Sequence, residues 1–364
     1  MKVQTVCNIL EEFAPLALQE SYDNAGLIVG DPFMEVNGIL ISLDVTMEVL
    51  EEAKRKKCNF ILAHHPLIFN SLKRLVGQNE TERCVIFALK HDLAIYAGHT
   101  NVDNLWNGVN QKIAEKLQLV HTKVLKPLSH QLLKLVTFVP HAHADKVRKA
   151  MFEAGAGSIG NYDSCSYNVE GTGTFKAQEN AHPFVGEHNE FHAEPETRIE
   201  VILPSYLKNS VVNALLQAHP YEEPAYDLIP LENEWNRAGA GLLGNLEIPT
   251  DELAFLHRLK TVFSVPCIRH TSLLGKNIVK VAVCGGAGSA FLKDAVQQGA
   301  DIYISADFKY HEFFNAEGKI LIADVGHYES EQFTKDIFYE IISKKIPNFV
   351  VKISETYTNP INYL

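Results

Sequence analysis

The sequence predicts an α/β protein into which a smaller α+β domain is inserted. In the first and last thirds of the chain, short apolar runs rich in β-branched residues alternate with amphipathic helical segments, a pattern typical of parallel sheets. The middle third instead contains two β-α-β halves, which indicates a ferredoxin-like unit. A length of 364 residues is sufficient for two hydrophobic cores.

The elements of the two flanks are expected to combine into one domain. The first third has predicted strands at 37–46, 59–65 and 93–103 and predicted helices at 47–57 and 81–92. The last third has predicted strands at 278–288, 301–312 and 319–331 and a helix at 289–300. Because each flank alone holds too few strands for a closed sheet, residues 1–125 and 233–364 are predicted to form a three-layer αβα domain with one sheet.

Residues 126–232 are predicted to form the inserted domain. Strands are expected at 132–140 and 196–204, with a last strand after 219, and helices at 144–155 and 206–219. A stretch rich in Gly, Asn and Ser separates the two halves.

Composition excludes several classes of protein. With 46% apolar and 21% charged residues, the chain resembles an ordinary soluble globular protein, and no apolar run is long enough to cross a membrane. The first residues lack a secretory cleavage site, so the protein is expected to be cytoplasmic, without a membrane partner. The six cysteines form no C-x-x-C pair, and a net charge of −11 argues against nucleic-acid binding. The 16 histidines are a reason to look for metal ligands.

Two adjacent histidines, His64 and His65, follow the apolar run at 59–63 and precede Pro66. Successive side chains of a strand face opposite ways, so the two cannot both enter a sheet core. Just past the end of the strand, both can face one cleft. Taken alone, the pair fits equally well with one core histidine and one exposed histidine.

Polar residues also end two other predicted strands. Asp103 closes the segment GHTNVD four residues after His99, where helix capping alone is an adequate explanation. In ADVGHYESE a helix is expected to begin near His327, which places His327 and Glu331 on one face. Glu329 should point elsewhere, about 200° around that helix. The alternative is an acidic first turn that interacts with the helix dipole.

Together these groups favour a metal site, because the carboxyl ends of parallel strands lie at one edge of a sheet. Three histidines and two carboxylates without a thiolate suit Zn, Mn, Fe, Co or Ni better than Mg or Ca. Five ligands exceed the number that one catalytic zinc normally takes. They suit two ions about 3.5–4 Å apart that a carboxylate bridges. We therefore predict two divalent metal ions per chain, held by His64, His65, Asp103, His327 and Glu331.

The motifs that contain these residues resemble those of the GTP cyclohydrolase I type 2 family, also called the NIF-three-like family. The segment SYDNAGLIVGD at 21–31 is similar to the family's aromatic-Asp-Asn-x-Gly-Leu segment, with Tyr22 where many members carry Trp. LDVT, HHPLIF, GHTNVD, GGAG, DFKYHE and DVGHYESE follow in family order over nearly the whole chain. The resemblance implies that the five residues bind two divalent metals, with Glu331 as the bridge. It further implies a CutA- or PII-like inserted domain and a toroidal homohexamer whose metal sites face an inner cavity.

The resemblance also implies a reaction. In the family's assigned activity, water opens the guanine ring of GTP, formate leaves, and dihydroneopterin triphosphate forms. A pair of metal ions serves such a hydrolysis by lowering the pKa of bound water and polarising the substrate. His99, Lys309 and His311 are candidates for proton transfer or phosphate contact. Two alternatives stay open: a di-metal phosphohydrolase or amidohydrolase acting on another nucleotide or heterocycle, and a non-enzymatic metal-trafficking or regulatory protein.

Two further segments have competing explanations. The GGAG segment at 285–288 precedes a predicted helix and either binds phosphate through its N–H groups or permits close strand–helix packing. It lacks the Lys-Ser/Thr tail of an ATPase P-loop. His188 and His192 lie where family members usually have a shorter link, and a solvated loop is favoured there over a second weak metal site.

Overall fold

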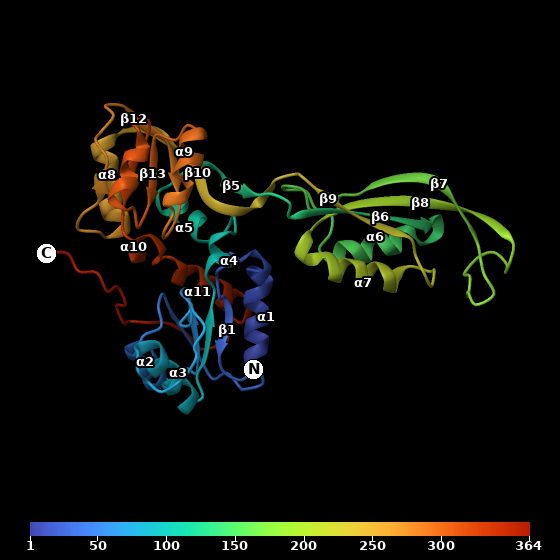
Figure 1. The fold of residues 1–364 in the computed structure, drawn as a ribbon, viewed down its shortest axis with the longest axis horizontal. Coiled ribbons are helices and arrows are strands. Elements are labelled where there is room, and N and C mark those ends of the chain that lie inside the picture. Colours follow the sequence, from blue (N-terminus) through green and yellow to red (C-terminus); the bar gives the residue numbers. More distant parts are fainter. The chain divides into compact units, whose positions relative to one another are not determined.

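The computed structural model describes residues 1–364 and divides into two compact units (Figure 1). Unit 1 comprises Met1–Pro127 and Arg237–Leu364, and unit 2 comprises Leu128–Asn236. The α/β fold with an inserted α+β part, predicted from the sequence, is confirmed. None of the helices combines the length and the hydrophobicity that crossing a membrane requires.

The first sheet of unit 1 contains five strands in the order β1-β4-β3-β2-β15. β2, β3, β4 and β15 are mutually parallel, and β1 pairs antiparallel with β4 at the edge. The strands are β1 (Gly26–Val29), β2 (Ile39–Ser42), β3 (Phe60–Ala63), β4 (Ala94–Ala97) and β15 (Val351–Ile353). The helices that follow or flank them are α1 (Val3–Phe13), α2 (Met47–Arg55), α3 (Glu80–Lys90), α4 (Thr100–Asp103), α5 (Val109–Lys116) and α11 (Thr334–Lys345), with the 3₁₀ turn η1 (Leu16–Leu18).

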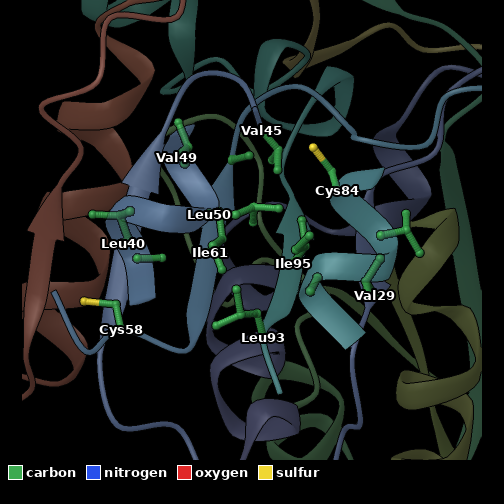
Figure 2. Close-up of a cluster of buried hydrophobic side chains, with 14 residues drawn as sticks. Val29, Leu40, Val45, Val49, Leu50, Cys58, Ile61, Cys84, Leu93 and Ile95 are labelled. Atoms are coloured by element: carbon green, nitrogen blue, oxygen red, sulfur yellow. The ribbon is translucent and has the colours of Figure 1, made fainter. Parts of the chain in front are cut away.

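One face of this sheet forms a continuous apolar core with α2 and α3. Figure 2 shows Leu40, Ile61 and Ile95 from three successive strands facing Leu50 of α2 and Cys84 of α3. All five side chains are almost fully buried. Because every residue of β2, β3 and β4 is buried, these strands are covered on both faces, and α11 contacts β2 while α1 packs against α11.

The second sheet of unit 1 contains six strands in the order β11-β14-β13-β12-β10-β5. β12, β13 and β14 are parallel, whereas β10 and β11 pair antiparallel with β12 and β14. The strands are β5 (Val120–Leu128), β10 (Trp235–Asp251), β11 (Arg269–His270), β12 (Asn277–Val283), β13 (Ile302–Ser305) and β14 (Leu321–Asp324). The helical elements are α8 (Glu252–Phe263), α9 (Leu292–Gln297) and α10 (His327–Glu331), with the 3₁₀ segments η4 (Ser289–Phe291) and η5 (Tyr310–Ala316).

The two halves of the chain therefore build two sheets rather than the single sheet expected from the strand count. Each half nevertheless contributes a strand to the other: β5 joins the C-terminal sheet, and β15 joins the N-terminal sheet. This exchange explains why neither flank held enough strands for a complete sheet of its own.

Unit 2 has the β-α-β-β-α-β order of a ferredoxin-like domain. Its sheet, β7-β8-β6-β9, is antiparallel throughout, and Figure 1 shows α6 and α7 on the same face of it. The elements are β6 (Leu132–Pro140), α6 (Ala144–Glu153), β7 (Tyr167–Lys176), β8 (Phe191–Pro204), α7 (Lys208–Ala218) and β9 (Tyr226–Leu231), with 3₁₀ turns η2 (His141–His143) and η3 (Ser205–Leu207). The sequence did not predict β7, because nearly all of its side chains are exposed and give no apolar pattern.

Candidate metal centre

The twin histidines lie at a tight corner that follows β3. The backbone N–H groups of His64 and His65 both donate to the carbonyl of Leu43, at 3.1 and 2.9 Å, which ends the strand ladder at Ala63. The two imidazole rings consequently lie 4.8 Å apart, centroid to centroid. The corner thus places the two rings beside each other just past the end of the strand, as the sequence pattern suggested.

Each of these rings is oriented by an acceptor at its Nδ1 atom. His64 Nδ1 donates to the carbonyl of Gly98 at 2.8 Å, and His65 Nδ1 donates to Asp44 Oδ1 at 2.7 Å. The second carboxylate oxygen of Asp44 accepts a hydrogen bond from Thr358 Oγ1 at 2.5 Å. A ring whose Nδ1 carries the proton presents the lone pair of Nε2, which is the form that binds a metal ion.

The third histidine belongs to the second sheet. Gly326 has φ +91°, and this turn after β14 starts α10 at His327. His327 and Glu331, one helical turn apart, bring Nε2 and Oε2 within 3.0 Å, and His327 Nδ1 donates to Asp307 Oδ2 at 2.7 Å. Glu329 points away and accepts a hydrogen bond from Asn359 Nδ2 at 2.9 Å.

Glu331 is where the two sheets meet. Its Oε2 atom lies 2.8 Å from His65 Nε2 and 3.6 Å from His64 Nε2. His327 Nε2 also lies 3.3 Å from His65 Nε2. Atoms from the corner after β3 and from α10 therefore converge on one carboxylate, which is buried.

Two buried polar atoms in the cluster lack any partner: His64 Nε2 and Asp103 Oδ1. They lie 3.7 Å apart, too far for a hydrogen bond to each other. Asp103 ends the short helix α4 instead of capping it at the start, so the capping explanation does not apply. An unpaired acceptor in a buried site is costly, and a cation between these two atoms would satisfy both.

The ligand atoms form three overlapping groups suited to a metal ion, two of which contain Glu331. Of these two, one is His64, Asp103 and Glu331, and the other is His65, His327 and Glu331. Within each group the ligand atoms lie within 4.8 Å of one another. The donor set contains imidazole and carboxylate and no thiolate, which fits borderline divalent metals.

The electrostatics of the cluster also fit a cation. Burial raises the pKa of Asp103 above its ordinary value, and the negative charge of Glu331 adds to this. Burial opposes ionisation of Glu331 as well, but the surrounding imidazoles of His64, His327 and His65 outweigh it and hold its pKa below the ordinary value. Burial lowers the pKa of His65, yet the carboxylates of Asp44 and Glu331 raise it to about 9.

A hydrogen-bonded pair of a partly buried histidine and an acid, His99 and Asp23, adjoins the cluster. His99 Nδ1 donates to Asp23 Oδ1 at 2.7 Å, and the His99 ring lies 5.3 and 5.5 Å from those of His64 and His65. Thr100 donates to Asp23 through both its backbone N–H and its hydroxyl. Burial alone would raise the pKa of Asp23, but the hydrogen bonds from His99 and Thr100 lower it to about 2. His99 thus faces the cluster with Nε2 free, and it also forms a potential ligand group with His64 and His65.

Lys309 and His311 do not join the cluster. Asp307 has φ +56°, and the chain then enters η5, where His311 is exposed and contacts Tyr310 and Phe314. Lys309 is exposed too, and neither residue forms a hydrogen bond or ion pair with the histidines. Their predicted place at a strand end was wrong, because β13 stops at Ser305.

The GGAG turn serves packing rather than phosphate binding. Gly285, Gly286 and Gly288 already donate their N–H groups to side chains, namely Asn110 Oδ1, Ser330 Oγ and Ser305 Oγ. A Cβ atom on Gly286, whose φ is +62°, would lie 2.1 Å from Glu331 Oε1. Glycine here allows the turn to approach the carboxylate of the cluster.

His188 and His192 form no metal group. His188 Nε2 lies 2.8 Å from the carbonyl of Ala181, and His192 Nε2 lies 2.9 Å from Glu194 Oε2. His192 belongs to an extended strand, so the i, i+4 spacing does not bring the two rings together.

Sequence reasoning assigned no role to the groups that orient the imidazoles: Asp23, Asp44, Asp307 and the Gly98 carbonyl. All four lie in segments that the family resemblance already contained, namely SYDNAG, LDVT, DFKYHE and GHTNVD. For Asp44 and Asp307 the available signal was an acid two residues after the end of a strand.

Unit 1 is an α/β protein whose two sheets meet at a cluster of histidines and carboxylates that could bind a metal ion. The chain belongs to the family described as Duf34/NIF3 (NGG1p interacting factor 3), which residues 1–360 match. It is 39% identical to the "GTP cyclohydrolase 1 type 2 homolog" of Halalkalibacterium halodurans, over 99% of this chain and 98% of that one. A Bacillus subtilis protein of the same name is 35% identical over the same shares. The crystal structure of a Bacillus cereus protein related to NIF3 superposes with a TM-score of 0.88 at 37% identity, covering 100% of this chain and 99% of that chain.

Proposed function

We propose that the chain is a dinuclear-metal-dependent hydrolase whose centre is the cluster around Glu331. The observation that carries this proposal is the pair of ligand groups that share Glu331 and no other residue. A carboxylate common to two sites is the usual bridge of two-metal hydrolases, in which the ions lie about 3.5–4 Å apart. A single ion would not need both groups.

The assignment of ligands follows from the two groups. His64, Asp103 and Glu331 would hold one divalent ion, and His65, His327 and Glu331 would hold the other. When bound, such ions supply a water of lowered pKa and polarise the oxygen or nitrogen of the substrate.

The remaining residues orient these ligands and handle protons. Asp44, Asp307 and the Gly98 carbonyl fix the protons of the three imidazoles on Nδ1, which keeps each Nε2 directed at the site. The Asp23–His99 pair resembles the acid–base dyads of hydrolases: Asp23 holds the Nδ1 proton of His99, so that Nε2 can accept a proton or return it.

For the substrate we propose GTP, with ring opening, loss of formate and formation of dihydroneopterin triphosphate. The support is the printed name of the relatives, "GTP cyclohydrolase 1 type 2 homolog". We also propose a homohexamer, as the family resemblance implies. The aromatic side chains Tyr310 and Phe314, 72% and 64% exposed, offer the type of surface that subunit contacts bury. Light scattering should then give six times the chain mass of 40.7 kDa.

The test is an incubation of metal-loaded protein with GTP, with formate and pterin fluorescence measured together. Formate release that depends on added metal supports the proposal, and the variant His99→Gln should slow it by about 10²–10⁴-fold while metal content stays the same. His257→Gln is the matched control, since that side chain is exposed on α8 and does not contact the cluster. Phosphate release without formate would favour a phosphohydrolase. Absence of turnover on a nucleotide panel, with transfer of metal to an apo-protein, would favour metal trafficking.

A further inference from the structure

Unit 2 contains a cavity of about 560 Å³ that takes no part in the metal centre. This volume lies in the range of small-molecule sites, roughly 300–1,000 Å³. Glu196 and Arg198 of β8 line it, whereas the alternate residues Ile199 and Val201 belong to the hydrophobic core of the unit. The cavity therefore opens on the face of the sheet that the core does not use.

Aromatic rings surround much of this cavity. Phe138, Phe175, Phe184 and Tyr221 all line it. The Tyr221 ring lies 6.2 Å from that of Phe175 and 6.3 Å from that of Phe184, and these pairs are inclined rather than stacked flat. Rings arranged in this way present their faces and edges to a common space.

Tyr221 is held in place by a buried histidine. His219 Nε2 donates to the carbonyl of Phe138 at 2.9 Å, and His219 Nδ1 accepts from the backbone N–H of Tyr221 at 3.1 Å. Burial lowers the pKa of His219, in agreement with this neutral form. These bonds hold the backbone at Tyr221, and the His219 ring also packs against the Tyr221 ring, with centroids 5.0 Å apart.

A buried carboxylate provides the charge of the cavity. Glu196 is only 7% exposed, and its Oε1 atom accepts a hydrogen bond from the Tyr221 hydroxyl at 2.8 Å. Its Oε2 atom has no hydrogen bond or ion pair within the protein. Gly173 makes room for it, since a Cβ atom there would lie 2.1 Å from Oε2.

The other charges of the lining do not neutralise Glu196. Arg198 is paired with Glu200 at 2.8 Å, and Glu222 and Glu223 add negative charge. Burial raises the pKa of the Tyr221 hydroxyl, and Glu196 raises it further, so the hydroxyl stays protonated and acts as a donor. An anionic ligand would meet repulsion here, and a neutral one would leave the carboxylate uncompensated.

We propose that this cavity binds a small organic ammonium ion between the aromatic rings, with Glu196 as its counter-charge. Aromatic faces attract ammonium groups by their quadrupole, and a nearby buried carboxylate adds a charge interaction in a medium of low dielectric. The unpaired oxygen of Glu196 is the group that such a ligand would satisfy.

Isothermal titration of the full-length protein with tetramethylammonium, choline and butylammonium chlorides tests the proposal. At least one probe should bind saturably. For choline, the neutral isostere 3,3-dimethylbutan-1-ol has the same shape without the charge, and its affinity should be lower by about tenfold or more. Equal binding of the isostere, or no saturation by any of the three probes, would overturn the proposal.

Variants of the cavity residues show separately how much the charge of Glu196 and the ring of Tyr221 contribute to binding. Glu196→Gln keeps an acceptor for the Tyr221 hydroxyl but removes the charge. It should lower the affinity for the probe that binds the wild type by about tenfold or more. Glu153→Gln on α6, an exposed position outside the cavity, is the control and should bind as the wild type does. A second pair of variants covers the case in which Glu196→Gln unfolds at a lower temperature. Tyr221→Phe, which retains the ring, should still bind the probe, and Tyr221→Leu should not. Unchanged affinity in both Glu196→Gln and Tyr221→Leu would contradict the assignment, whatever the outcome at the metal centre.

Discussion

His65 Nε2 and Glu331 Oε2 lie 2.8 Å apart although 266 positions separate the two residues in the chain. One follows a strand of the first sheet of unit 1, and the other ends a helix that follows a strand of the second sheet. The candidate metal centre therefore exists only when both sheets are folded and in contact. Metal binding and the stability of unit 1 should be coupled for this reason.

Asp44→Asn is expected to weaken metal binding without unfolding the protein. Asp44 orients His65 through Nδ1, and loss of such an outer carboxylate typically lowers metal affinity by about 10–100-fold. Competition with a chromogenic chelator measures this. The matched control is Asp92→Asn, an exposed position with φ +50° that asparagine tolerates. Equal affinities for the two variants would show that Asp44 does not support the site.

Gly286→Ala should reduce stability and metal binding by more than the strain of an alanine in a left-handed conformation alone would cause. The new Cβ would lie 2.1 Å from Glu331 Oε1, so the carboxylate or the turn must move. Gly275→Ala is the control, because Gly275 has φ +72° and no atom within 4 Å of an added Cβ. The control should lose about 1 kcal/mol of unfolding free energy and keep its metal. Gly286→Ala should lose more and bind less metal, and identical behaviour of the two would refute the steric argument.

Glu52→Gln should destabilise unit 1 in a manner that depends on pH. The buried Glu52 carboxylate accepts hydrogen bonds from Ser354, Glu355 and Thr356 and pairs with Lys56. Burial opposes its ionisation, but these donors outweigh it and lower the pKa to about 2. A lowered folded-state pKa means that the stabilisation is complete above the ordinary value of 4.5 and is lost as the pH falls toward 2.

Urea unfolding at pH 7 should therefore show Glu52→Gln to be less stable than the wild type by about 1.5–3 kcal/mol. The difference should shrink as the pH is lowered from 4.5 towards the value of about 2. Glu51→Gln, at the exposed neighbouring position, should remain within about 0.5 kcal/mol of the wild type. A difference that stays constant with pH would contradict the role given to the ionised carboxylate.

Replacing Leu128–Asn236 by a short glycine-rich linker should leave unit 1 folded and able to bind metal. An added Cβ on Gly239 would lie 2.1 Å from the carbonyl oxygen of Lys126, so the chain leaves and re-enters unit 1 at neighbouring points. The core of unit 2 consists entirely of its own residues. Circular dichroism, thermal unfolding and metal content of the shortened protein check this. An insoluble product would show that the inserted part is needed for folding.

The sequence was sufficient to predict the clustering of the motifs because strand ends are readable from apolar runs. His64, His65 and Asp103 follow strands of one sheet, and His327 with Glu331 follows a strand of the other. The sequence could not show that two sheets are present, because β5 and β15 pair with strands more than 100 positions away. Such long-range pairing leaves no local pattern.

The orienting residues were missed for a related reason. Asp44 and Asp307 contact histidines of the cluster only through the tertiary fold, and an acid after a strand has many other uses. His311 and Lys309 were placed wrongly because the left-handed conformation of Asp307 redirects the chain into η5. Asp307, rather than the basic residues after it, is the residue of that segment that reaches the cluster.

Under the proposed function, Glu331 joins two metal ions. Elemental analysis of the purified full-length protein, with Glu331→Ala and Glu329→Gln prepared in parallel, decides whether it does. We expect two ions per chain in the wild type and in Glu329→Gln, because Glu329 contacts Asn359 instead of the cluster. Glu331→Ala should retain neither ion. A Glu331→Ala protein that still holds two ions per chain, or a fully loaded wild type that holds only one, would contradict the shared-carboxylate centre.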